Sequence, residues 1–145
     1  MKQKQKDLLL KDLCSRLTYG VKVKFGDSKP ALLTVIEHDE FGWQIGSEDE
    51  FGGMITIIDN VKPYLFPLSS MTDTQEQEFL SVAGYERREE DCGRHTETYY
   101  YDMVGHEHNF YPNSDAIDWL IKNHFDIYGL IPMGLAIDAT DKNIY

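Results

Sequence analysis

Apolar residues near the start of the chain recur at helical spacing. Residues 5–17 repeat apolar side chains at i, i+3, i+4 and i+7, which predicts a helix with one apolar and one basic face. In this pattern Cys14 is a small core residue and Arg16 lies on the opposite, polar side. Gly20 follows, where a left-handed residue commonly ends a helix. The apolar face holds Leu9, Leu10, Leu13, Cys14 and Leu17.

A second and more apolar helical pattern begins at Asn113 and is predicted to stop by about Tyr128. Either Asn113 or Ser114 can cap its start. His124 lies on the apolar stripe, and we interpret it as a hydrogen-bonded core histidine. After this helix, glycine and proline interrupt the chain, and residues 135–137 are predicted to form a short buried strand or packed tail. The stripe consists of Ile117, Leu120, Ile121, His124 and Phe125.

Short apolar stretches between these helices alternate with turns, which is typical of an antiparallel sheet. Four stretches with tight connections predict a four-stranded meander, which becomes an SH3-like small barrel if it curls. These strands are expected at residues 21–25, 31–37, 43–45 and 54–58. Residues 59–68 are predicted to be an irregular crossing segment, because Pro63 and Pro67 each lack a backbone donor.

A helix is predicted over residues 72–83. Thr72 and Gln75 match a capping box, and Gly84 suits the position after the last turn. Its apolar face, formed by Phe79, Leu80, Val82 and Ala83, is modest.

The following residues are the most polar in the chain. Residues 85–93 are predicted to be a surface loop and a candidate boundary between two lobes. Residues 95–103 are rich in aromatic residues and threonine, which predicts a strand in a hairpin that returns through residues 109–111.

Taken together, these elements predict an α+β fold. It begins with a helix, continues with the four-stranded antiparallel meander or small barrel, and ends with a short β-hairpin and helices. We expect one lobe at residues 1–84 and a second at residues 85–145 that packs on it, or one domain made of the whole chain.

Charge and composition narrow the class of protein. The net charge is −11, and it is uneven, because the first 30 residues carry +5 and the remainder −16. An acidic body repels phosphates, so direct nucleic-acid binding is not expected. No apolar run approaches the roughly 20 residues of a membrane helix, and no export signal is recognised at the N-terminus. With only two cysteines, the chain is predicted to be a cytoplasmic protein.

One group of residues has the chemistry of a metal site. Cys92, His95, His106 and His108 combine thiol and imidazole groups, which are the ligands that zinc favours. Their spacing is not that of the common structural zinc motifs, so a polar hairpin end remains the alternative interpretation.

Motifs of the common enzyme classes are absent from the sequence. It contains no G-x-S-x-G, Walker-type or G-x-G-x-x-G run. A cluster of tyrosines remains, and strand alternation would expose part of it. Tyrosine offers a large rigid surface with a polar end, so Tyr99, Tyr101 and Tyr111 are candidate interface residues. The alternative is that cross-strand packing and the C-terminal helix cover them.

Three segments together suggest a relationship: LCSRLTYGVKVKF, VKPYLFPLSSMT and WLIKNHFDIYGLIPMGLAID. They resemble a family of small proteins of anaerobic gut bacteria that are often associated with phages or mobile elements. That family has no assigned activity, so the resemblance implies kinship and transfers no site residue.

These observations favour a non-enzymatic protein-interaction or accessory module whose partner and oligomeric state the sequence does not define. Two alternatives stay open. The acidic body is compatible with a nucleic-acid mimic or nucleic-acid-associated protein. The cysteine and histidine set is compatible with a small zinc-binding protein.

Overall fold

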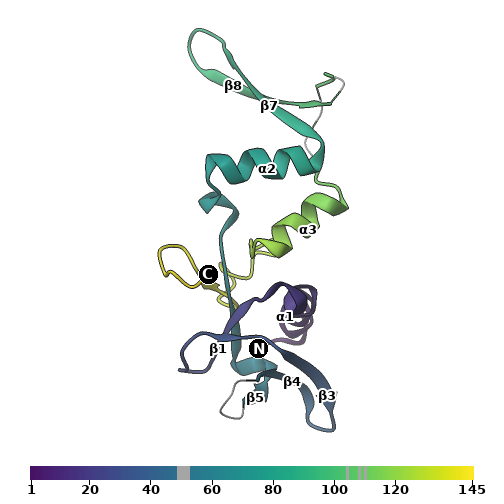
Figure 1. Ribbon diagram of the computed structural model, residues 1–145, viewed down its shortest axis with the longest axis vertical. Helices are drawn as coiled ribbons and strands as arrows, with labels where there is room; N and C mark the ends of the chain where they lie inside the picture. Colours follow the sequence, from purple (N-terminus) through teal and green to yellow (C-terminus); the bar gives the residue numbers. More distant parts are fainter. Residues whose placement is uncertain (49–52, 104, 108, 110) are drawn as a thin grey trace. The chain divides into compact units, whose positions relative to one another are not determined.

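A computed structural model describes residues 1–48, 53–103, 105–107, 109 and 111–145 (Figure 1). By their internal contacts they form two compact units, which we treat separately. Unit 1 is residues 1–70 together with 121–145, and unit 2 is residues 71–120. The fold is α+β, as predicted. The division differs from the predicted lobes because the C-terminal residues return to the N-terminal part of the chain, where they add a strand to its sheet.

Helix α1 (Gln3–Arg16) of unit 1 buries a different stripe from the one predicted. Its buried residues keep the i, i+3, i+4, i+7 spacing, but they include a charged pair, Asp12 and Arg16. Cys14 is exposed, so its assignment to the core was wrong, as was the assignment of Arg16 to the polar side. Both errors have one cause: the apolar pattern treats every charged residue as solvent-facing, whereas this pair is buried together.

The first sheet of unit 1 has the strand order β2-β1-β6-β9. Strands β1 (Lys22–Phe25) and β2 (Ala31–Leu32) are antiparallel, as are β1 and β6 (Val61–Leu65), while β9 (Ile137–Asp138) is parallel to β6. The second sheet is an antiparallel meander, β3-β4-β5. Its strands are β3 (Val35–Asp39), β4 (Gly42–Ser47) and β5 (Met54–Ile57). The predicted meander is therefore divided between two sheets, with the stretch at 31–37 split between β2 and β3.

Strand β6 corrects the prediction that residues 59–68 are irregular. Pro63 lies opposite Val23. The hydrogen bond from Gly26 N to Asn60 O shows which opposing pairs of β1 and β6 are hydrogen-bonded and which are not. In that alternation Pro63 occupies a non-hydrogen-bonded pair, so its nitrogen faces away from β1. On the other side, β9 pairs only with the two residues that follow Pro63. The proline therefore sits where neither neighbouring strand needs its donor.

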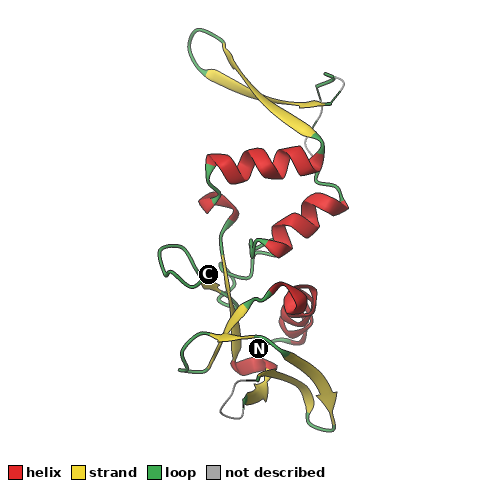
Figure 2. Ribbon diagram, viewed as in Figure 1, coloured by secondary structure: helices red, strands yellow, loops and turns green. Residues whose placement is uncertain are grey.

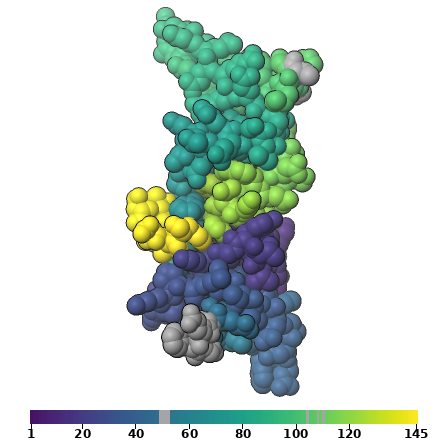
Figure 3. Space-filling model, in the orientation of Figure 1, coloured from purple at the N-terminus to yellow at the C-terminus, as the bar shows by residue number. Residues whose placement is uncertain are grey.

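A buried polar network joins α1 to the C-terminal residues of unit 1. The Arg16 guanidinium binds both Asp12 carboxylate oxygens at 2.8–3.0 Å and donates to the carbonyls of Ile121 at 3.0 Å and Phe125 at 2.7 Å. The space-filling view shows the yellow C-terminal residues beside the N-terminal part of the chain (Figure 3). Arg16 thus satisfies carbonyls near the end of a helix in the C-terminal segment.

His124 lies beside this network in a strained backbone conformation. Its φ is 63°, which is uncommon for a residue other than glycine, and this turn stops helix α3 at Lys122. The ring stacks on Tyr145 with centroids 4.2 Å apart. Among the described residues its Nδ1 is buried with no hydrogen-bond partner, contrary to the expected core hydrogen bond. Burial, assisted by Arg16, lowers the pKa of His124 to about 4.

Unit 2 contains a helix, a hairpin and the start of a second helix (Figure 2). Helix α2 (Asp73–Ala83) has the predicted capping box of Thr72 and Gln75 and ends at Gly84 in the left-handed region. Strands β7 (Tyr85–Asp91) and β8 (Thr96–Asp102) then pair over their whole length. Helix α3 (Ser114–Lys122) follows, with Asn113 Oδ1 accepting from Ala116 N at 2.9 Å.

The β7–β8 pair corrects two predictions. Residues 85–93 were expected to be a loop, but seven of them form β7. The partner of β8 was expected at residues 109–111, but it is β7. Strand β7 was not predicted because almost all of it is exposed, so its sequence lacks the apolar alternation that indicates a strand. Neither face of this hairpin forms a continuous apolar core.

Candidate functional site

The β7–β8 hairpin presents two faces that differ in chemistry. Its register pairs Arg87 with Tyr100 and Arg88 with Tyr99, so neighbouring pairs point to opposite sides. We name the two sides the inner and the outer face. The inner face consists of Tyr85, Arg87, Glu89, Asp91, Thr96, Thr98, Tyr100 and Asp102. The outer face consists of Glu86, Arg88, Glu90, Glu97, Tyr99 and Tyr101.

Contacts with α2 identify the inner face. Arg87 forms an ion pair with Glu76 of α2 at 2.5 Å and a second with Glu89 of its own strand. An open hollow of about 780 Å³ lies between α2 and the hairpin and is lined largely by acidic and polar side chains. The described part of unit 2 therefore places α2 on the inner side. Alternation directs the outer face to the other side of the hairpin, except that Glu86, near the start of β7, also lines the hollow.

The outer face combines aromatic rings with charged groups. The Arg88 guanidinium lies 4.5 Å from the Tyr101 ring centroid, and Arg88 also pairs with Glu86 at 3.2 Å. The Tyr99 hydroxyl donates to Glu97, which raises the pKa of Tyr99 to about 12. Both tyrosines are half-buried, so cross-strand packing uses part of each ring and leaves the rest accessible.

The third predicted interface residue, Tyr111, is 72% exposed. It lies in the segment before α3, outside the β7–β8 ladder. The hairpin thus brings Tyr99 and Tyr101 together on one face, and Tyr111 is not part of that ladder.

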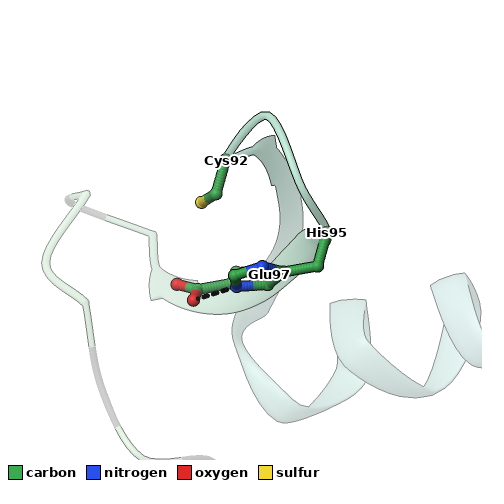
Figure 4. A group of neighbouring side chains, drawn as sticks. All are labelled: Cys92, His95 and Glu97. Atoms are coloured by element: carbon green, nitrogen blue, oxygen red, sulfur yellow. Dashed lines mark hydrogen bonds and ion pairs between the residues drawn. The ribbon is translucent and has the colours of Figure 1, made fainter.

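The turn of the hairpin gathers three potential metal ligands: Cys92, His95 and Glu97 (Figure 4). One ligand atom from each lies within 4.8 Å of the other two, and His95 Nε2 is 2.7 Å from Glu97 Oε1. Hydrogen bonds from Tyr99 and then His95 lower the pKa of Glu97. Desolvation by neighbouring atoms, followed by the charges of Glu97 and Glu90, raises the pKa of the Cys92 thiol.

Of the three predicted metal ligands that the structure describes, Cys92 and His95 meet there and His106 does not. His106 lies at the opposite end of the hairpin, where its backbone carbonyl accepts from Asp102 N and its ring lies 3.5 Å from the Asp102 carboxylate. The seven residues of β8 run from Thr96 at the turn to Asp102 at that end, a length of roughly 20 Å for extended chain. His108 lies outside the described residues.

Sequence reasoning missed Glu97 because its proximity to Cys92 depends on where the turn falls. The alternation of HTETYYY places Glu97 on the side of Tyr99 and Tyr101. Once β7 is recognised as the partner strand, that alternation also places Glu97 directly opposite Glu90.

The sequence also concealed an apolar strip on the β3-β4-β5 sheet of unit 1. Ile55 and Ile57 share one face of β5 and are 59% and 45% exposed. A Cβ added at Gly46 would lie 3.0 Å from Ile55 Cγ1, so glycine permits close packing in this sheet. Among the described residues, the structure places nothing on this strip that identifies a ligand.

No protein-family model, curated protein or solved structure matches the chain. In the described part of the chain, every helix is too short or too polar to cross a bilayer.

Proposed function

We propose that this chain is a non-enzymatic, cytoplasmic interaction module that binds a partner protein through the outer face of the β7–β8 hairpin, as an accessory factor of a mobile element. The supporting observation is the composition of that face. Tyrosine and arginine are the residue types most enriched among those that dominate binding energy, and here Arg88 and Tyr101 are already stacked. A stacked pair loses little rotamer freedom when a partner binds.

The architecture of the hairpin supports the same role. A β-hairpin of only two strands is marginally stable in water. The strands of this hairpin have seven residues each, which is long for a two-stranded hairpin that no other sheet covers. The inner face has α2 beside it, whereas Arg88, Tyr99 and Tyr101 of the outer face alternate to the other side of the hairpin. A partner laid on the outer face would complete its burial.

Charge on the outer face selects the kind of partner. Three carboxylates, Glu86, Glu90 and Glu97, surround the single guanidinium of Arg88. A partner surface rich in lysine or arginine would be attracted to this face and oriented on it.

Site-specific photo-cross-linking in native cells tests the proposal. A benzoylphenylalanine at Tyr101 reports contacts on the outer face, and the same group at Tyr100 is the matched control on the inner face. We expect one specific adduct from position 101 and a weaker or absent adduct from position 100. An equal yield from both positions, or no adduct from position 101, would contradict the proposal.

The acidic outer face also favours a second candidate, mimicry of nucleic acid towards a DNA-binding protein. Competition separates this case, because DNA would displace the chain from a mimicry partner and would leave the other kind of complex intact. In a mobility-shift assay without the partner, the chain itself is expected to leave labelled DNA unshifted.

A further inference from the structure

We infer that the turn of the β7–β8 hairpin binds a divalent transition metal, with Zn²⁺ as the best match, through Cys92 Sγ, a ring nitrogen of His95 and a carboxylate oxygen of Glu97. The site needs no residue of the proposed partner, because all three ligands come from this chain. Zinc accepts thiolate, imidazole and carboxylate together, and three protein ligands leave one position for water or a partner's side chain.

The distances require only small movements. A tetrahedral zinc centre with these donors separates its ligand atoms by roughly 3.3–3.8 Å, given metal–ligand bonds of about 2.0–2.3 Å. The atoms here already lie within 4.8 Å of one another. The pair of His95 and Glu97 must open from 2.7 Å, and Cys92 Sγ must approach by about 1 Å. All three side chains can make these adjustments by rotation about their own bonds.

The backbone of the turn holds the first two ligands close together. Cys92 N donates to His95 O at 3.0 Å, which closes the four-residue connection. Gly93 has φ 78°, where a side chain would be strained, and its N–H donates to the Asp91 carboxylate at 2.8 Å. This turn therefore brings the two side chains of the Cys-x-x-His sequence, Cys92 and His95, to the same site.

Electrostatics give an independent reason for a cation. The register places Glu90 directly opposite Glu97 on the outer face, an arrangement of like charges that destabilises a strand pair. A divalent ion at the turn would offset this repulsion, and the thiol would release its proton to solvent as it binds.

The surroundings also supply an outer-shell partner. The Tyr99 hydroxyl donates to the second oxygen of Glu97, Oε2, which leaves Oε1 directed at His95. Such hydrogen bonds orient metal-binding carboxylates. Because the ligands come from both ends of the turn, metal binding would clamp β7 to β8 and order the face that carries Tyr99.

Titration of the full metal-free chain with Co²⁺ tests the inference, because cobalt adopts the zinc geometry and reports each ligand in its visible and near-ultraviolet spectrum. We expect a sulfur-to-cobalt charge-transfer band that saturates at one equivalent and disappears when Zn²⁺ is added, since zinc binds more tightly. The band should be lost in Cys92→Ser and kept in Cys14→Ser, the only other cysteine in the chain. A wild-type chain without the band, or a band that survives Cys92→Ser, would overturn the inference.

Two further variants guard against misfolding of the cysteine variant. His95→Ala and Glu97→Gln keep the thiol, so each should retain a weaker band with Co²⁺ affinity reduced by more than the ~10-fold typical of an outer-shell change. Tyr99→Phe should lower affinity by about 10-fold. Unchanged affinity in both His95→Ala and Glu97→Gln would contradict the assigned ligands.

Discussion

The two units use the same kind of ion pair in opposite surroundings. In unit 1 the Asp12 and Arg16 side chains are 0% exposed, and Arg16 also binds two backbone carbonyls. In unit 2 the Arg88 and Glu86 side chains are 50% and 61% exposed. A buried pair is costly to break, whereas an exposed pair contributes little to stability. The comparison separates charges that hold a fold from charges that remain accessible to a partner.

The largest expected effect comes from breaking the buried pair. Arg16→Met leaves Asp12 as an uncompensated buried charge and should lower the free energy of unfolding by about 3–5 kcal/mol. Denaturant unfolding of the full chain measures this loss. The double variant Asp12→Leu/Arg16→Met should recover part of it. An Arg16→Met chain as stable as wild type would show that this network does not hold unit 1 together.

The next effect is a pH dependence centred on His124. Its pKa falls from 6.5 to about 4 on folding, so the unfolded chain binds more protons between these values. The contribution of neutral His124 to the free energy of unfolding is therefore fully present above pH 6.5. It is lost as the pH falls towards 4, and the loss is on the order of 2–3 kcal/mol. His124→Asn tolerates the positive φ and should flatten this part of the stability–pH curve. Equal slopes in wild type and His124→Asn would contradict the assignment.

A smaller effect is expected at the start of α2. Thr72 Oγ1 accepts from Gln75 N at 3.3 Å, so Thr72→Ala should cost about 1 kcal/mol. Thermal unfolding followed by circular dichroism measures it, and Thr72→Ser is the matched control that keeps the hydroxyl. A loss as large in Thr72→Ser as in Thr72→Ala would show that the cap hydrogen bond is not responsible.

The smallest effect on stability is expected at Arg88. Arg88→Ala removes an exposed ion pair and a stacked ring contact, so the free energy of unfolding should change little. Cross-linking from position 101 should nevertheless decrease strongly. If Arg88→Ala unfolded readily, or cross-linked as well as wild type, the exposed ion pair of unit 2 would not differ in role from the buried pair of unit 1.

Local signals in the sequence predicted much of the fold. The capping box at Thr72, the left-handed Gly20 and the alternation in residues 21–25 each depend on neighbouring residues, and the structure confirms them. Contacts between residues that are distant in the sequence were harder to predict. Pro63 is tolerated in β6 because its nitrogen faces away from β1 and because β9, which is distant in sequence, begins to pair only at the next residue, Tyr64. Burial of Arg16 likewise depends on carbonyls more than 100 residues away.

The candidate site shows the same limit. Residue types identified Cys92 and His95 as potential ligands and Tyr99 and Tyr101 as accessible aromatics. Glu97 joins them only through the register of β7 with β8, because a shift of one residue would turn it to the inner face. The polar composition of β7 concealed that register, since it offers no apolar alternation to read.

The central claim is that unit 1 provides most of the stability, whereas the hairpin of unit 2 opens locally and is accessible to a partner. Backbone hydrogen exchange, measured residue by residue on the full metal-free chain, tests this claim most directly. We predict that amides of β1 and β6 exchange only through global unfolding, whereas paired amides of β7 and β8 exchange much faster through local opening. Equal protection in the two regions would contradict the account.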